Sequence, residues 1–235
     1  MNAEPRTENP EPSDLSLQHW WTRNHAGRAL AASELAFLGA LSSMLDTLAP
    51  PQVDPALCAI TVRGASALIA LIPHRHLGGL TLVATMAERF VAVSWTSISD
   101  LDVHDDLDLT REVYLYTRDE EGSDAAMRRA AVRGVREQLG RPIVLRLRST
   151  RRGVPLSASC WLRSADGELR RIARLPPRAS LFDRLRQRGV RSEIEIRFTD
   201  RQPPPYAVPS FAGAWFRAHA RVRRAAASPA GEPPA

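Results

Sequence analysis

The sequence contains no lysine, and all 32 residues counted as Lys or Arg are arginine. Walker A loops need a lysine on the nucleotide phosphates, and protein kinases of the usual type need one on a strand. Pyridoxal phosphate enzymes and Schiff-base aldolases need a lysine amine to form the imine. This chain alone therefore cannot build any of these sites. We attribute the absence to genomic base composition, and we use it only to exclude these classes.

Cysteines and long apolar runs are also scarce. The only cysteines, Cys58 and Cys160, are too few and too far apart for a disulfide framework or a CxxC motif. No run of about 18 apolar residues indicates a transmembrane helix. Residues 1–14 lack the basic and apolar regions of a secretory signal. From these absences we expect a cytoplasmic protein without a transmembrane segment.

The charges that are present divide unevenly along the chain, although the net charge is only +6. Residues 1–122 hold 8 arginines against 17 acidic residues, a net of −9, and residues 123–235 hold 24 arginines against 9, a net of +15. A chain polarised in this way either folds so that its halves neutralise each other or presents one sign of charge to a partner.

Hydrophobic spacing and turn residues divide most of the chain into short elements. An Asp166-Gly167 pair predicts a hairpin turn, because both positions can adopt a positive φ. Spacings of three and four residues and local caps predict helices that begin near Ser13 and carry Trp20 and Trp21, and at about 30–49, 123–139 and 180–188. Apolar runs and alternation predict strands at about 58–63, 67–72, 80–85, 90–95, 113–117, 143–149, 154–163, 169–175 and 190–198.

This order of elements, with short connections between most strands, predicts an α+β fold. We expect a largely antiparallel sheet with helices on one face, an N-terminal helical segment and a C-terminal basic helix. The expected organisation is a disordered tail at 1–12, a single domain at 13–201, a Pro-rich linker at 202–209, a basic amphipathic helix at 210–227 and a disordered tail at 228–235.

Sites for chemistry are weak in this sequence. His74 and His76 alternate as two metal ligands on an extended segment would, and His104 lies in an acidic stretch that could add oxygens. No third ligand has a fixed spacing, so we expect no metal and no cofactor. Cys160 shares a strand face with apolar neighbours, which indicates a buried thiol and not a nucleophile. We therefore assign no catalytic residue.

Arginines on alternating strands form the most informative surface. Guanidinium groups suit both carboxylate and phosphate, and Trp161 is the one aromatic residue among these arginines that could stack on a base. The C-terminal helix combines an apolar stripe with arginines, and it could dock on its own domain or on a partner. The candidate partner-binding residues are Arg146, Arg148, Trp161, Arg163, Arg170, Arg174, Arg197, Trp215, Arg217 and Arg221.

The sequence thus favours a non-enzymatic module that binds an acidic protein partner through an Arg-rich sheet face. The alternative is a nucleic-acid-associated protein that uses the same face. A third hypothesis is a metal-dependent enzyme built on His74, His76 and His104. Two tryptophans near the N-terminus and the apolar second helix could equally serve a homo-oligomer interface.

Overall fold

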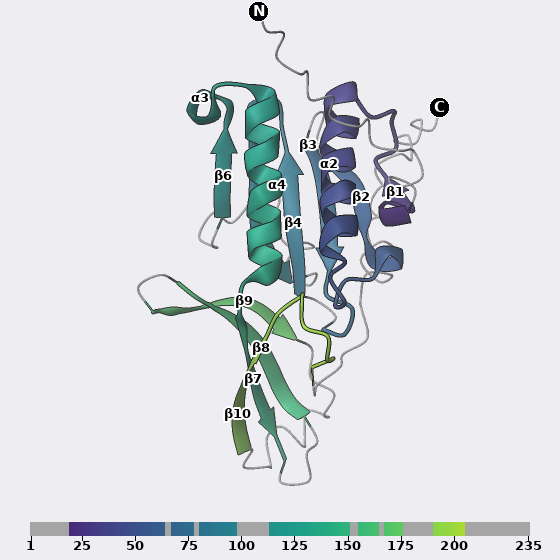
Figure 1. Cartoon of the computed structure of the whole chain (residues 1–235). Coiled ribbons are helices and arrows are strands. Elements are labelled where there is room, and N and C mark those ends of the chain that lie inside the picture. Colours follow the sequence, from purple (N-terminus) through teal and green to yellow (C-terminus); the bar gives the residue numbers. More distant parts are fainter. Residues whose placement is uncertain are drawn as a thin grey trace, which may run out of the picture.

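The computed structural model describes residues 19–63, 67–77, 80–97, 113–150, 155–164, 167–175 and 190–204. Its fold is mixed α+β, with strands in two mostly antiparallel sheets and the longer helices packed against the larger sheet. Figure 1 shows the smaller sheet below the ends of the two long helices. The expected α+β class is confirmed, but the strands form two sheets where we expected one.

The first sheet has six strands in the order β1-β2-β3-β4-β5-β6. Only β1 runs parallel to its neighbour, and all the other pairs are antiparallel. Each strand after β1 lies beside the next along the chain, which is the meander that short connections predict. The strands are β1 (Arg23–His25), β2 (Ala59–Arg63), β3 (Ala67–Pro73), β4 (Leu80–Met86), β5 (Phe90–Ser97) and β6 (Val113–Thr117).

Helix α2 (Ala32–Leu48) forms where the apolar stripe predicted a helix. Its first turn is capped by Glu34, whose carboxylate accepts hydrogen bonds from the backbone N–H of Ala31 and from Arg28. Its last turn ends at Ala49, which adopts a positive φ before Pro50. Glu34 thus provides the capping oxygen, because Ala31 at the N-cap position has no side-chain oxygen.

Trp20 and Trp21 were expected to lie in a helix of their own. They are instead buried against α2. Among the described residues only His19 and Trp20 are helical before the chain extends into β1, and Ser13 lies outside the described part. The indole N–H of Trp20 donates to Asp46 and that of Trp21 donates to Ser42. Both rings are buried within the chain and hydrogen-bonded to α2, so they do not provide an exposed dimer interface.

Helix α4 (Asp124–Gly140) is capped by the Ser123 side chain, as expected, and follows the short helix α3 (Arg118–Glu121). It lies over β4, β5 and β6. Gly134 faces Tyr116 of β6 so closely that an added Cβ would overlap the phenol oxygen and lie 2.6 Å from the ring carbon Cζ. The close approach of α4 to the sheet edge therefore depends on the absence of a side chain at Gly134.

The second sheet has four antiparallel strands in the order β10-β7-β8-β9. Gly167, with a φ of 86°, lies in the β8–β9 hairpin where a glycine was expected. The helix expected at 180–188 and the segment 205–235, with its expected helix at 210–227, lie outside the described residues. The strands are β7 (Ile143–Ser149), β8 (Pro155–Arg163), β9 (Leu169–Leu175) and β10 (Val190–Ile196).

A ring cluster joins the two sheets. Phe198, just after β10, is fully buried, and its ring centroid lies 4.8 Å from that of His74 and 5.3 Å from that of Trp95. The Trp95 indole donates to Gln138 near the end of α4. Gln52, before β2, donates to the backbone carbonyls of Asp200 and of Gln202. The inward residues of both sheets therefore belong to one continuous hydrophobic cluster.

None of the helices in the described part of the chain is long and apolar enough to span a membrane.

We expect Gly134→Ala to lower the free energy of unfolding by about 1–3 kcal/mol, because the methyl group overpacks the contact with Tyr116. Gly140→Ala is the matched control, since an added Cβ there meets nothing within 4 Å. It should leave stability unchanged or raise it by up to about 1 kcal/mol. Urea unfolding of the three proteins measures both effects. Equal stability of the two variants would show that the Gly134 contact does not hold α4 to β6.

Candidate partner-binding face

The outer face of the second sheet is the side of the pleat that points away from the shared core. On β7, Ile143 and Leu145 point into the core, and the alternating residues Val144, Arg146 and Arg148 point to the other side. Pairing in register extends this face across all four strands. Its members are Val144, Arg146 and Arg148 on β7, Ser157, Ser159 and Trp161 on β8, Arg171 on β9, and Arg191, Glu193 and Glu195 on β10.

A β-bulge changes which arginines of β9 belong to this face. The register shifts between Cys160 and Trp161, so that Trp161 pairs with Arg171 and buried Leu162 pairs with Arg170. Arg170, a candidate from the sequence, therefore lies on the opposite side of the pleat, where it forms an ion pair with Glu168. Arg171, which the sequence analysis did not select, takes its place on the outer face. Strict alternation along 169–175 could not reveal this, because a bulge inserts one residue into the period of two.

Arg146 is at the centre of the outer face. Its guanidinium carbon lies 4.6 Å from the centroid of the Trp161 ring, and its Nε lies 2.7 Å from a carboxylate oxygen of Glu193. The Trp161 indole donates to Ser159 on the same face. Cation–π and ion-pair contacts thus hold the arginine between β8 and β10. Trp161 and Arg146, both selected from the sequence, are in direct contact.

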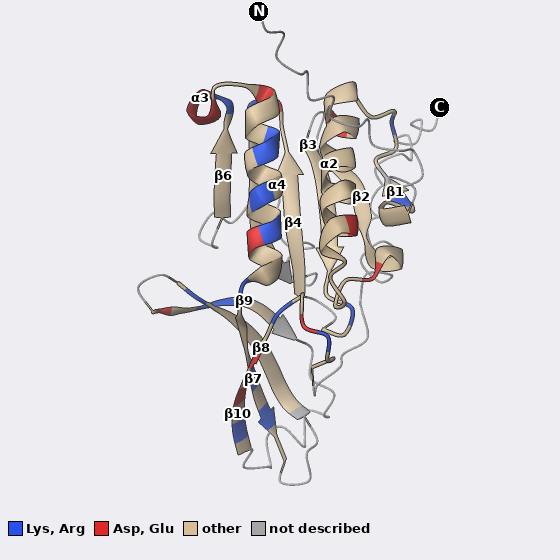
Figure 2. Ribbon diagram, viewed as in Figure 1, with Lys and Arg blue, Asp and Glu red and all other residues tan. Residues whose placement is uncertain are grey.

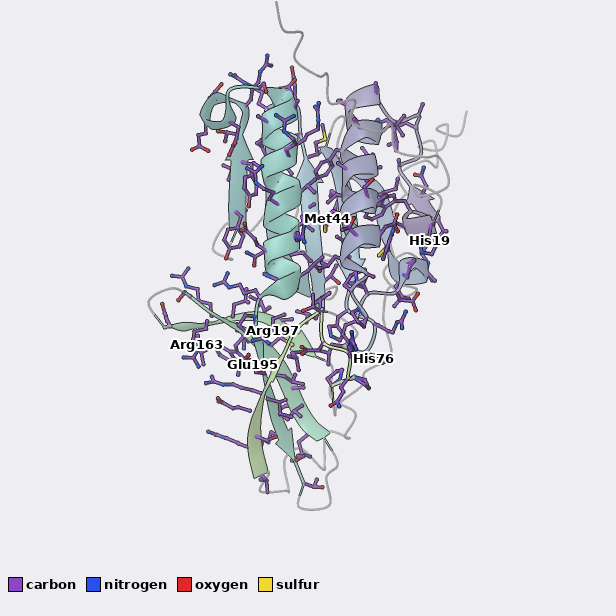
Figure 3. All side chains as sticks on the ribbon, in the orientation of Figure 1. His19, Met44, His76, Arg163, Glu195 and Arg197 are labelled. Atoms are coloured by element: carbon purple, nitrogen blue, oxygen red, sulfur yellow. The ribbon has the colours of Figure 1, made fainter. Side chains whose placement is uncertain are left out.

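Positive charges surround this centre. Exposed Arg148 lies directly opposite exposed Arg191 in the pairing of β7 with β10, and like charges in that position destabilise a sheet. Beyond the end of β10, Arg197 forms an ion pair with Glu195 at 2.6 Å. Exposed Arg163 ends β8, and Figure 3 labels it together with Arg197 and Glu195. Arg148, Arg163 and Arg197 thus lie on or beside the face predicted for them.

The other candidates cannot be placed in the same way. Arg174 pairs with Ser159 in register, but its side chain lies outside the description. Trp215, Arg217 and Arg221 lie outside the described residues, and so does His104.

Helix α4 carries a second set of exposed arginines that the sequence analysis did not select. Arg129, Arg133 and Arg136 are spaced by four and three residues, so they share one side of the helix. Figure 2 shows these positive positions along α4, separate from those on the second sheet. The signal was present in the sequence as charge at helical spacing on the side opposite the apolar stripe.

His74 does not have the chemistry of a metal ligand here. It is buried, and its Nδ1 accepts hydrogen bonds from the backbone N–H groups of His76 and Leu77, which occupies the lone pair. Burial, with a smaller contribution from the charge of His76, lowers the pKa of His74 to about 3. The imidazole is therefore neutral at pH 7. Among the described residues no group of three His, Cys, Asp or Glu side chains could hold a metal ion.

Both thiols are buried, and burial keeps them protonated. Burial raises the pKa of Cys160 to about 12 and also raises that of Cys58. Since the thiolate is the nucleophile, neither cysteine suits covalent catalysis.

We expect His74 to make stability depend on pH. Its folded pKa is depressed, so the unfolded chain binds more protons between about pH 6.5 and pH 3, and stability falls as the pH falls through that range. His74→Asn keeps an acceptor for the two backbone N–H groups but does not titrate. Urea unfolding between pH 7 and pH 5 should show a slope smaller by up to about 1.4 kcal/mol per pH unit in this variant. Equal slopes in wild type and His74→Asn would contradict the burial argument.

Comparisons with known proteins add no relative. The chain matches no protein-family model, no curated protein and no solved structure. What it binds must therefore be inferred from the contacts of its own residues.

Proposed function

We propose that this protein is a non-enzymatic interaction module whose outer face on the second sheet binds an acidic surface of a protein partner. The observation that supports this most is the cross-strand arrangement of Glu193, Arg146 and Trp161. Aromatic and arginine side chains held in place across strands are typical of the residues that dominate binding energy at protein interfaces. Arg148, Arg171 and Arg191 around them supply charge for carboxylates.

The mixture of charge on this face favours a protein over a nucleic acid. Glu193 and Glu195 put two carboxylates among the arginines, and these would repel a continuous row of phosphates. On a protein partner, charges of both signs instead fix the register of the complex. The ring of Trp161 is also in contact with the Arg146 guanidinium, so a base would have to displace that contact before it could stack.

Nucleic-acid binding is the alternative function that uses the same face. The observation in its favour is the excess of arginine around Trp161, which resembles the basic and aromatic composition of single-strand binding surfaces. Phosphate binding releases counterions, so its affinity falls steeply and log-linearly with salt. A protein interface with an apolar centre depends much less on salt.

We predict that Arg148→Glu combined with Arg171→Glu weakens capture of the partner, because the substitutions reverse two charges on the outer face. The matched control is Arg129→Glu with Arg136→Glu, which makes the same charge change on exposed positions of α4. Tagged wild type and both variants are used to capture partners at low salt without nuclease. One stoichiometric protein should bind to the wild type and to the α4 variant, and binding to the sheet variant should fall at least about tenfold.

Other outcomes would redirect the proposal. A nucleic-acid-rich eluate that clears at moderate salt would overturn the protein interpretation in favour of the alternative. Loss of the partner only in the α4 variant would move the interface to Arg129 and Arg136. Retention by both variants would show that neither basic surface binds the partner.

A further inference from the structure

Both faces of the first sheet are buried, but the described helices cover only one of them. Figure 1 shows α2 and α4 side by side on the same side of the strands. Residues such as Ile60, Ala70, Leu82 and Val93 point toward these helices and belong to the continuous core cluster. We call the opposite side the second face. Its members include Thr61, Leu71, Val83, Thr85 and Ala92, which alternate with the helix-facing residues.

The second face is covered although it does not belong to the core cluster. Leu71 and Val83 are 3% and 5% exposed, and Thr61 and Thr85 are each 5% exposed. Leu71 and Val83 do not belong to the hydrophobic cluster that contains residues of α2, α4 and β9. Burial ends at the edge of the sheet, because Leu115 of β6, on the same face, is 54% exposed. Both α2 and α4 lie on the other side of the sheet, so these two helices do not account for the burial over β2, β3, β4 and β5.

The attachment points of the other long segments argue against them as the cover. Residues 1–18 lead into Trp20 and Trp21, which are held by α2 on the opposite side of the sheet. Residues 98–112 join β5 to β6, at the edge where burial is lost. Residues 176–189 join β9 to β10 at the end of the second sheet away from the ring cluster.

The C-terminal segment begins in the right place and is long enough. Gln202 accepts a hydrogen bond from Gln52, the neighbour of Val53, which pairs with His74 at the end of β3. The chain then continues from buried Pro204 for another 31 residues, 205–235. Five residues of extended Pro-rich chain reach about 15 Å, and an 18-residue helix extends about 27 Å, which matches the roughly 24 Å length of a seven-residue strand.

The residue pattern of this segment also fits an apolar sheet face. Phe211, Trp215, Ala218 and Val222 recur at spacings of three and four, so in a helix they form one stripe. The arginines at 217, 221, 223 and 224 fall on the other side of that helix. A helix of about 10–12 Å diameter covers two to three strands spaced about 4.8 Å apart.

We propose that residues 210–227 dock as a helix on the second face, with Trp215 against Leu71 and Val83, and with the arginines exposed on its outer side. Trp215 then belongs to the fold of this chain and is not available to a partner. Arg217 and Arg221 remain accessible and form a basic surface distinct from the outer face of the second sheet. The docked helix completes a three-layer arrangement in which the first sheet lies between helices.

The test uses the full chain with a protease recognition sequence in place of residues 205–209, cleaved only after folding. The released piece should stay with the body in native size-exclusion chromatography and separate in urea. Trp215→Ala in the same chain should release the piece after cleavage and, before cleavage, lower Tm by about 5–10 °C. Arg217→Ala is the matched control, and it should keep the piece bound and Tm unchanged.

Separation of the wild-type piece in native buffer, with Tm unchanged by cleavage, would overturn the proposal. A dimer in sedimentation, with Tm unaffected by Trp215→Ala, would show that a second copy covers the face instead. Val83→Glu in the cleavable chain provides an independent variant, because it should release the piece while Trp215 is intact. None of these outcomes depends on the outer face of the second sheet, so partner capture can fail or succeed separately.

Discussion

The contact of Phe198 with His74 and Trp95 is the interaction on which the arrangement of the two sheets depends. Phe198 lies just after the last strand of the second sheet, and its ring packs against His74 and Trp95 at the first sheet. The Trp95 indole also connects this cluster to the end of α4. A buried neutral histidine suits this place, because its ring packs edge to face against the phenyl ring while its Nδ1 satisfies two backbone donors of the following turn. The direction of the outer face is therefore set by apolar packing and not by the charges it carries.

Local patterns in the sequence predicted most of the elements. Apolar stripes and caps gave the bounds of α2 and α4 to within two residues, since Ser123 and Pro50 are strong signals at helix ends. Apolar runs and alternation predicted every strand in both sheets except β1. That strand has three residues and pairs in parallel with β2, so its position is decided by the burial of Trp20 and Trp21 and not by its own pattern.

Properties that depend on pairing between distant segments could not be predicted in this way. The division into two sheets follows from the ring cluster around Phe198, which brings together residues more than 100 positions apart. In the candidate site, alternation correctly put Arg146, Arg148 and Trp161 on one face, and it misplaced Arg170 because the bulge in β9 is invisible in composition. The sequence also left open whether the acidic half neutralises the arginines. Among the described residues, Arg146 and Arg197 form ion pairs with Glu193 and Glu195, which belong to the same Arg-rich half.

The burial of the two thiols has a practical consequence for work in solution. Burial raises the pKa of Cys160 to about 12 and also raises that of Cys58, so both thiols stay protonated at pH 7. The two native thiols should therefore not react with maleimides in the folded protein. A single cysteine introduced on either basic surface would then be the one reactive thiol among the described residues, so that a fluorophore or crosslinker could be attached there without first removing a native cysteine.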